Sequence, residues 1–172
     1  MVPDGTPPPP GHLSATEWWP TARPGHHVPH VWLARGSERV STSDLVSPTG
    51  LTLFVDASSS ALWQDAVAGR PDRVTVVTVG DALVDDTGEW ANVRGTRPTG
   101  AVLVRPDRHV AWRVAVAPAD PAAELQAVLD RLLRTPPATG WNPADSLAGI
   151  TEAGEALRVT AARAPQLFTV TD

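Results

Sequence analysis

The 172-residue sequence contains no cysteine and no lysine. Without cysteine there are no disulfides, no thiol redox chemistry, no thiolate metal ligands and no cysteine nucleophile. Without lysine there is no Schiff-base chemistry and no lysine-bearing phosphate-binding loop. No apolar run approaches the roughly 18 residues needed to span a bilayer, and residues 1–10 lack the basic and apolar regions of a signal peptide. We therefore expect a soluble, cytoplasmic protein with no membrane partner.

Patterns for binding nucleic acids and nucleotides are missing as well. The formal net charge is −5, from 19 acidic and 14 basic residues, and an acidic chain with scattered arginines is not expected to bind nucleic acid. No two glycines stand two positions apart, which excludes the G-x-G-x-x-G dinucleotide motif. Gly80-Asp81-Ala82 is interpreted as a turn at the end of a strand, and the G-x-S-x-G motif of serine hydrolases is absent. We expect no catalytic, cofactor-binding or metal-binding residue in this chain.

The apolar residues that are present, 42% of the chain, are enough for the core of one domain. Apolar, β-branched runs indicate strands, and apolar residues at a 3.6-residue period indicate helices. Strands are predicted over 51–56, 73–80, 101–106 and 108–116, helices over 59–68 and 121–134, and a short strand or turn over 38–46. The segment 81–98 is predicted to be an irregular connection with at most one helical turn.

Both predicted helices have boundary signals. Asp120 and Pro121 are typical of the N-cap and the first position of a helix. The serines at 58–60 are expected to cap the helix over 59–68. The apolar stripes are predicted to consist of Leu62, Trp63, Ala66 and Val67 in the first helix and of Leu125, Val128, Leu129, Leu132 and Leu133 in the second.

The order of these elements predicts an α/β protein with a thioredoxin-like fold. Strand, helix and strand over 51–80 form a parallel βαβ unit, and the strands at 101–106 and 108–116 form an antiparallel hairpin around Pro106-Asp107. Together they give a central mixed sheet of about four strands with flanking helices. Redox members of this fold carry Cys-x-x-Cys after the first buried strand, where this sequence reads DASSSALW over 56–63. Dithiol exchange is therefore excluded.

Three segments are predicted along the chain. Residues 1–35 are rich in proline and are expected to form an extended arm. Residues 36–135 form the thioredoxin-like domain, and residues 136–172 form a C-terminal tail with a short helix near 151–163. Trp18 and Trp19 indicate that the arm lies on a surface, either that of its own domain or that of a partner outside this chain.

Three groups of polar side chains are candidates for a binding or catalytic site. His26, His27 and His30 are close in sequence, but the prolines around them disfavour a frame that would align them on a metal. The acidic residues within 85–89 lack the spacing of a calcium loop and are interpreted as a solvated loop.

The third group lies on the predicted strand 108–116. His109 and Arg113 are expected to share one face by the two-residue period, with Trp112 on the other. Trp112 is interpreted as a core residue and Arg113 as a partner in an ion pair or hydrogen bond.

Four sequence segments, taken in order, resemble one known family. They are PTARPGHHVPHVWL (20–33), STSDL (41–45), LTLF (51–54) and LVRPDRHVAWR (103–113). They are similar to the series P-G-x-R-x-P-H-x-W-L, S-T-L-D-L, F-T-L-L and L-V-R-P-D-G-x-V-A-W-R in the C-terminal domain of FAD-dependent aromatic-ring hydroxylases, the phenol hydroxylase and polyketide hydroxylase group. The resemblance covers about residues 1–135, and VPDGTPPPP (2–10) resembles the stretch that joins the flavin domain to this one. Three positions depart from the series: His27 replaces Arg, Ser43 replaces Leu and Arg108 replaces Gly.

The resemblance implies a thioredoxin-like domain without redox cysteines, which agrees with the fold predicted above. It implies FAD and NAD(P)H for the parent monooxygenase but no cofactor in this chain, a flavin-binding domain as partner in cis or in trans, and subunit contacts of a homodimer. The alternative is a free-standing, redox-inactive thioredoxin-like binding or scaffold protein. The motif residues, with an expected structural or interface role, are His27, His30, Trp32, Asp44, Arg105, Asp107, Trp112 and Arg113.

Overall fold

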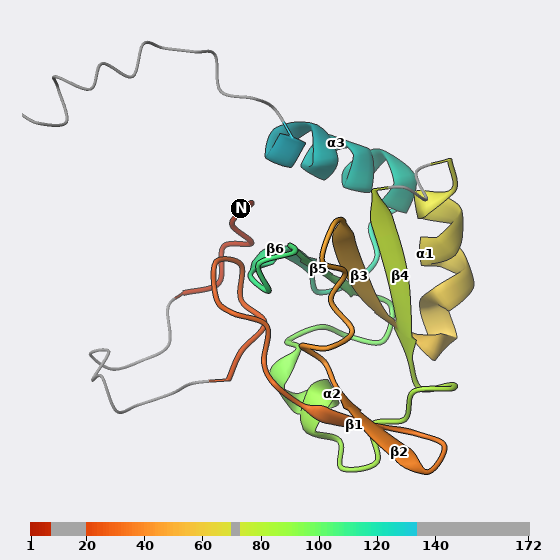
Figure 1. Cartoon of the computed structure of the whole chain (residues 1–172). Helices are drawn as coiled ribbons and strands as arrows, with labels where there is room; N and C mark the ends of the chain where they lie inside the picture. The colour runs from red at the N-terminus through yellow and green to blue at the C-terminus, as the bar shows by residue number, and fades with distance from the viewer. Residues whose placement is uncertain (8–19, 70–72, 134–172) are drawn as a thin grey trace, which may run out of the picture. The chain divides into compact units, whose positions relative to one another are not determined.

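A computed structural model describes residues 1–7, 20–69 and 73–133 of the chain (Figure 1). These residues belong to a unit that spans Met1–Arg134. The elements are β1 (Trp32–Arg35), β2 (Glu38–Ser41), β3 (Leu51–Asp56), a 3-10 turn (Ala57–Ser59), α1 (Ser60–Val67), β4 (Val74–Val79), α2 (Glu89–Val93), β5 (Ala101–Val104), β6 (Val110–Val114) and α3 (Pro121–Leu133). The predictions for Trp18, Trp19 and the tail 136–172 fall outside the described residues.

Four strands form the central mixed sheet, in the order β4-β3-β5-β6. β3 and β4 are parallel, with Leu51 opposite Val74, and α1 connects them. β5 is antiparallel to both β3 and β6. The two inner strands, β3 and β5, are buried along nearly their whole length, which explains their continuous apolar sequences. The predicted βαβ unit, the hairpin and the α/β fold class are confirmed.

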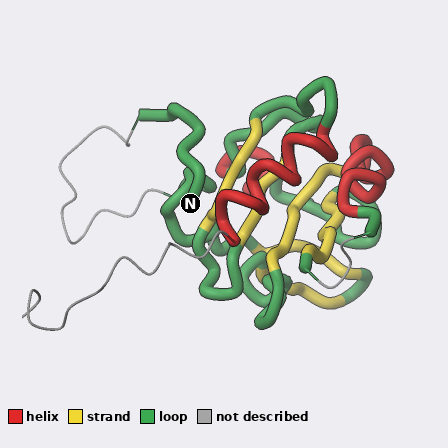
Figure 2. The backbone as a smooth tube through the Cα atoms, turned by 90° about the horizontal axis from the view of Figure 1, so that it is seen from above, coloured by secondary structure: helices red, strands yellow, loops and turns green. Residues whose placement is uncertain are grey.

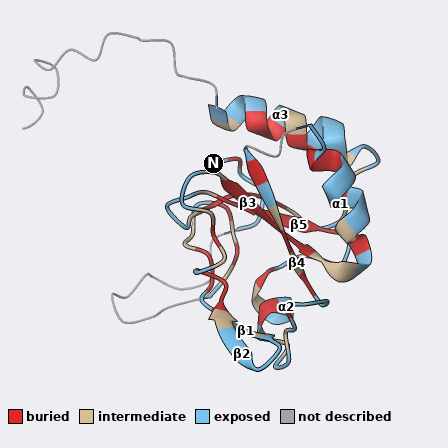
Figure 3. Cartoon of the chain, turned by 45° about the vertical axis from the view of Figure 1, so that its right-hand side comes forward, coloured by how far each residue is buried: buried red, intermediate tan, exposed pale blue. Residues whose placement is uncertain are grey.

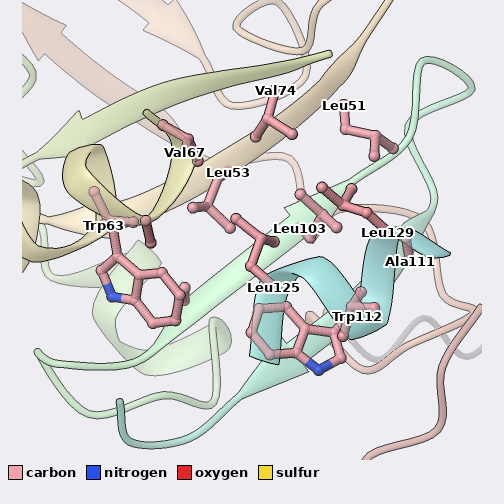
Figure 4. Packing of buried hydrophobic residues seen from close by; sticks show 14 of the residues in the cluster. Leu51, Leu53, Trp63, Val67, Val74, Leu103, Ala111, Trp112, Leu125 and Leu129 are labelled. Atoms are coloured by element: carbon pink, nitrogen blue, oxygen red, sulfur yellow. The ribbon is translucent and has the colours of Figure 1, made fainter. Parts of the chain in front are cut away.

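Helices α1 and α3 lie side by side against one face of the sheet (Figures 1 and 2). Trp63 and Leu125 are fully buried there, and Figure 4 shows them meeting Leu53, Leu103 and Trp112 between the sheet and the helices. In each helix, one residue that was predicted to belong to the buried apolar stripe is exposed. Leu62 and Leu133 are 42% and 49% exposed, because each lies beside the row of residues that contacts the sheet rather than within it.

The opposite face of the sheet is covered by the β1–β2 hairpin, by α2 and by the chain before β1. Val28, Val31 and Leu33 are at most 1% exposed and pack with Phe54 and Trp90. Figure 3 shows buried residues, in red, in the segment that leads into the hairpin, while β1 and β2 themselves are mostly exposed or intermediate. β1 lies within the segment that the sequence analysis assigned to an extended arm. Its prolines hid a short strand that is stabilised by pairing with β2, with Leu33 opposite Val40.

The N-terminal segment also covers the edge of the sheet at β6. The amide of Val2 donates to the carbonyl of Ala111 at 2.7 Å, and the amide of Gly25 donates to that of Val110 at 2.8 Å. The amide of Val110 in turn donates to the carbonyl of His26 at 2.9 Å. Val2, Gly25 and His26 therefore pair with backbone groups of Val110 and Ala111 at the start of an edge strand.

Two local predictions about helix starts had different outcomes. Asp120 caps α3, because its Oδ1 accepts from the amide of Ala123 at 2.9 Å. The serine cap predicted for α1 is wrong, since Ser59 makes no capping hydrogen bond. The 3-10 turn starts the helical path one turn earlier, so Asp56 takes the cap position and accepts from the amide of Ser58 at 3.0 Å. Among the described residues, no helix is long and apolar enough to cross a membrane.

Candidate functional site

The first candidate site is the edge at the carboxyl ends of β3 and β4, where the sequence analysis located the missing redox motif. Asp56 ends β3, and its Oδ1 accepts from the hydroxyl of Ser58 at 2.7 Å. Its Oδ2 pairs with Nη1 of Arg94 at 3.3 Å. Burial opposes ionisation of Asp56, but the hydrogen bonds from Ser58 and Arg94 and the charge of Arg94 outweigh it and lower the pKa of the carboxyl. Asp56 is therefore a fixed anion rather than a proton donor.

Hydrogen bonds also connect this edge of the sheet to the loop that follows α2. The hydroxyl of Ser59 donates to the carbonyl of Pro98 at 2.8 Å, and Nε1 of Trp63 donates to the carbonyl of Thr99 at 3.0 Å. The hydroxyls of Ser60 and Thr78 bond to each other at 2.8 Å. None of these described hydroxyls is hydrogen-bonded to a histidine, so the arrangement offers no activated nucleophile. These side chains instead connect the edge to the loop at 98–99 and to each other.

Arg113 is at the centre of the second candidate site, between β6 and the N-terminal segment. Its side chain is 7% exposed, and its Nε and Nη2 donate to Oδ2 of Asp4 at 2.8 and 2.5 Å. Nη2 also donates to the hydroxyl of Thr6 at 3.2 Å, and Nη1 donates to the carbonyl of Arg94 at 3.4 Å. The expected ion pair of Arg113 is confirmed. It joins residues 109 positions apart and fastens the N-terminal segment to the sheet.

The carboxyl of Asp4 is ionised in this arrangement. Burial opposes its ionisation, but hydrogen bonds from the hydroxyl and amide of Thr6, and the hydrogen bond and charge of Arg113, outweigh burial and lower the pKa of Asp4. The guanidinium of Arg113 also passes over Gly95, where an added Cβ would overlap Nη1. Gly95 has a positive φ of 67°, so both its backbone and the space around it require glycine.

A β-bulge changes the faces predicted for β6. Arg113 pairs with Val102 and Trp112 with Leu103, but Val110 rather than Ala111 lies opposite Val104. The extra residue reverses the alternation, so Val110 shares the face of Arg113 and His109 does not. The prediction that His109 and Arg113 share one face is therefore wrong. Trp112 is buried in the core as predicted, with its ring 6.1 Å from that of Trp63.

The turn between β5 and β6 contains two further motif residues. Arg105 and Asp107 form an ion pair, and the Nε of Arg105 lies 3.1 Å from Oδ1 of Asp107. Burial opposes ionisation, but hydrogen bonds from Arg105 and the amide of His109 and the charge of Arg105 lower the pKa of Asp107. Arg108, which replaces the glycine of the family series, has a positive φ of 65°. This left-handed conformation explains why a glycine is favoured at this position.

The remaining motif residues lie along the segment that leads into the hairpin. His27 and His109 form an isolated antiparallel β-bridge, and their rings lie edge to face with their centroids 5.5 Å apart. The ring of His30 meets Trp32 in the same way at 5.1 Å. Asp44 accepts from the hydroxyl of Ser41 at 2.7 Å in the turn after β2. The structure therefore distributes the motif residues over several separate places and forms no single cluster from them.

The histidines within 26–30 and the acidic residues within 85–89 were the remaining candidates for a metal site. The described residues contain no group of three or more side chains able to hold a metal ion. Burial and the charges of Arg23 and Arg113 lower the pKa of His26. Asp85 accepts from the amide of Ala91 at 2.9 Å at the start of α2, and Asp86 pairs with Arg39 at 3.2 Å.

A cavity of about 240 Å³ opens at the other end of the strands. It contains one charged side chain, Arg73, and otherwise small or apolar residues, so it offers no acid–base pair. Its lining residues are Thr49, Gly50, Leu51, Arg73, Pro106 and Leu133.

The sequence analysis named Arg113 but not its partners, Asp4 and Arg94. A buried arginine on a strand requires an acceptor, and this was the only signal for Asp4. Nothing in the spacing indicates which of the 19 acidic residues provides it.

The mixed sheet and the two helices on one face define a thioredoxin-like domain that contains no cysteine. The family model described as aromatic-ring hydroxylase, C-terminal, matches residues 21–136. The chain belongs to this family of hydroxylase C-terminal domains.

Individual relatives agree with this assignment. The chain is 42% identical over 119 residues to the tetracenomycin A2 monooxygenase-dioxygenase of Streptomyces glaucescens, covering 66% of this chain and 21% of that protein. It is 39% identical over 121 residues to the 2,4-dichlorophenol 6-monooxygenase of Cupriavidus pinatubonensis, covering 66% and 20%. The chain thus spans about a fifth of the length of these relatives.

Solved structures with FAD bound are also similar. The flavin-dependent monooxygenase PieE, in complex with FAD and substrate, matches with a TM-score of 0.70 and 36% identity over 79% of this chain and 24% of that one. Aklavinone-11 hydroxylase, in complex with FAD and aklavinone, matches with a TM-score of 0.59 and 39% identity over 67% and 22%.

Proposed function

We propose that this chain is the non-catalytic C-terminal domain of an FAD-dependent aromatic-ring monooxygenase, and that it acts by packing on the flavin-binding domain. The observation that carries the proposal is the family match over residues 21–136, in a chain that spans only a fifth of its FAD-dependent relatives. The reaction then belongs to the larger remainder of the polypeptide, with NAD(P)H as the reductant. Because NAD(P)H is a cytoplasmic metabolite, we also propose a cytoplasmic location.

The turn before α1 does not fit the pyrophosphate of FAD. A flavin pyrophosphate is bound by a glycine-rich turn at a helix N-terminus. Here the turn before α1 is Asp56-Ala57-Ser58-Ser59, and the ionised carboxylate of Asp56 already accepts the amide of Ser58. A second anion at this position would be repelled by Asp56. We therefore assign FAD to the preceding domain and no cofactor role to this one.

The test is the mass and absorbance of the native protein, captured from its source with an antibody against this chain. We expect a polypeptide several times larger than 18.2 kDa under denaturing conditions, or a tight complex with one, and a yellow native protein with flavin absorbance. A colourless 18.2 kDa protein would contradict the proposal and favour a free-standing scaffold protein. Light scattering of the same sample tests whether the proposed homodimer forms.

A further inference from the structure

The outer side of the β1–β2 hairpin exposes a tryptophan. Along β1 the side chains alternate, so Leu33 enters the core while Trp32 points outward. Val31 and Leu33 are at most 1% exposed, whereas Trp32 is 46% exposed. Among the described residues it is the only aromatic side chain that is large, apolar and exposed. An exposed tryptophan is unusual on a free surface and is typical of interfaces.

Trp32 is part of a patch that spans three chain segments. Ala34 is two residues from Trp32 on the same face of β1, and it exchanges two backbone hydrogen bonds of 2.8 Å with Val84. Val84 is 46% exposed. On the other side of β1, Ala34 pairs with Arg39, whose guanidinium forms the ion pair with Asp86. We call this surface, formed by Trp32, Ala34, Arg39, Val84 and Asp86, the Trp32 face.

The Trp32 face has the composition and the rigidity of a docking site. An apolar centre of Trp32, Ala34 and Val84 is bordered by the ion pair of Arg39 and Asp86, which resembles the apolar core and polar rim of protein interfaces. Nη2 of Arg39 also donates to the carbonyl of Trp32 at 3.4 Å. The indole of Trp32 also meets the ring of His30 edge to face at 5.1 Å, which restricts the indole before binding and lowers the entropy cost of association.

The flavin-binding domain can reach this face from the point where the chain enters. Met1 lies against Gly25, since a Cβ there would be 2.5 Å from the Met1 sulfur. From Gly25 to Trp32 are seven residues, which span at most about 25 Å even when fully extended. In the relatives the matching domain is C-terminal and covers about a fifth of the chain, so several hundred residues precede it. A domain of that size has a radius of gyration of about 20 Å.

We propose that the Trp32 face is the surface on which the flavin-binding domain of the same hydroxylase docks, with Trp32 as its central contact. This inference rests on the proposed function, because it needs a flavin domain as partner. A second copy of this chain, or residues 8–19 of the chain itself, are the other occupants that the experiment must separate from it.

The experiment is hydroxyl-radical footprinting with mass spectrometry on two samples, the free 172-residue chain and the native flavoprotein captured as described above. Leu62 is the reference, since it is 42% exposed and lies on α1, across the sheet from the hairpin. We expect oxidation of Trp32 to fall several-fold in the flavoprotein while oxidation of Leu62 stays the same. The free chain is measured as a monomer and, at high concentration, as any dimer it forms.

Each other outcome overturns the inference in a recognisable way. Trp32 already protected in the free monomer means that the chain covers its own face, and protection that appears only in a free dimer means that a second copy does. If the native protein is yellow but the oxidation of Trp32 and that of Leu62 change by the same factor between the two samples, the docking surface is contradicted and the proposed function stands. A colourless 18.2 kDa protein removes both.

Two matched variants provide a second measurement. In the native gene, Trp32→Glu is expected to lower the temperature at which flavin is released, because it places a charge in the interface. Leu62→Glu is expected to leave that temperature unchanged, and both free chains should unfold as the parent chain does. Flavin release that is unaffected by Trp32→Glu contradicts the inference.

Discussion

The two faces of the central sheet are closed by different means. On one face α1 and α3 bury Trp63, Trp112 and Leu125 between regular helices and the strands (Figure 4). On the other, a two-stranded hairpin, the five-residue α2 and an irregular N-terminal segment bury Phe54 and Trp90. Of the eight motif residues, only Trp112 lies in the helix-side core. The helix-side core therefore contains one motif residue, while the other seven lie on the hairpin side of the sheet or in the turn between β5 and β6.

The first way to test this comparison is to remove one tryptophan from each face. Trp63 and Trp90 are 0% and 1% exposed. Trp63→Ala and Trp90→Ala should each lower the free energy of unfolding by about 3–5 kcal/mol, with Trp63→Ala at the upper end because Thr99 also loses a hydrogen-bond donor. Chemical denaturation of the 172-residue chain measures both, with Leu62→Ala as an exposed control within about 0.5 kcal/mol. A near-neutral Trp90→Ala would show that the hairpin face is an appendage rather than part of the core.

The ion pair of Arg113 and Asp4 tests how firmly the N-terminal segment belongs to the hairpin face. Arg113→Met keeps much of the apolar stem but removes the donors to Oδ2 of Asp4 and to the carbonyl of Arg94. We expect a loss of about 3 kcal/mol, as for a buried pair from which one partner is removed. In a double-mutant cycle with Asp4→Asn, the two losses should not add, because the groups interact directly. Additive losses would show that Asp4 and Arg113 stabilise the domain independently.

The pH dependence of stability should expose the same ion pair. The folded-state pKa of Asp4 is lowered, so its contribution is present above the unfolded value of about 3.9 and is lost as the pH falls through the folded pKa. Asp56 and Asp107 act in the same direction. His26, whose pKa is also lowered, disfavours the folded state once the pH falls below about 6.5. Denaturation between about pH 3 and pH 7 should show a smaller acid loss for Asp4→Asn than for the parent chain. Parallel curves would exclude Asp4 as a contributor.

What could be predicted from the sequence follows the same division. The strand 51–56 and the helices at 59–68 and 121–134 are encoded by local periodicity and boundary residues, and they supply an inner strand of the sheet and both helices of the helix face. β1 was missed because four residues that follow a proline-rich segment become a strand only by pairing with β2. The face of His109 was missed because one bulge residue reverses the alternation of β6. Such features depend on contacts between distant segments, which no local pattern records.

The candidate sites divide in the same manner. Arg113 and Trp112 were assigned correct surroundings from the residue types alone, since a buried arginine needs an acceptor and a tryptophan on a strand favours the core. The identity of Asp4 as that acceptor, 109 positions away, required the structure. So did the exposure of Trp32 between two fully buried neighbours.

The smallest effects concern the helix caps, one on each face. Asp120→Ala removes the acceptor of the Ala123 amide at the start of α3 and should cost about 1 kcal/mol. Asp85→Ala removes the acceptor of two amides of α2, those of Trp90 at 3.3 Å and Ala91 at 2.9 Å. We expect Asp85→Ala to cost at least as much as Asp120→Ala, because a five-residue helix has few other hydrogen bonds to maintain it. Denaturation of both variants, with Asn at each position as the conservative control, measures the difference. If Asp85→Ala leaves the free energy of unfolding unchanged, α2 is held by the packing of Trp90 alone. The hairpin face would then depend on contacts between distant segments even for its one helix.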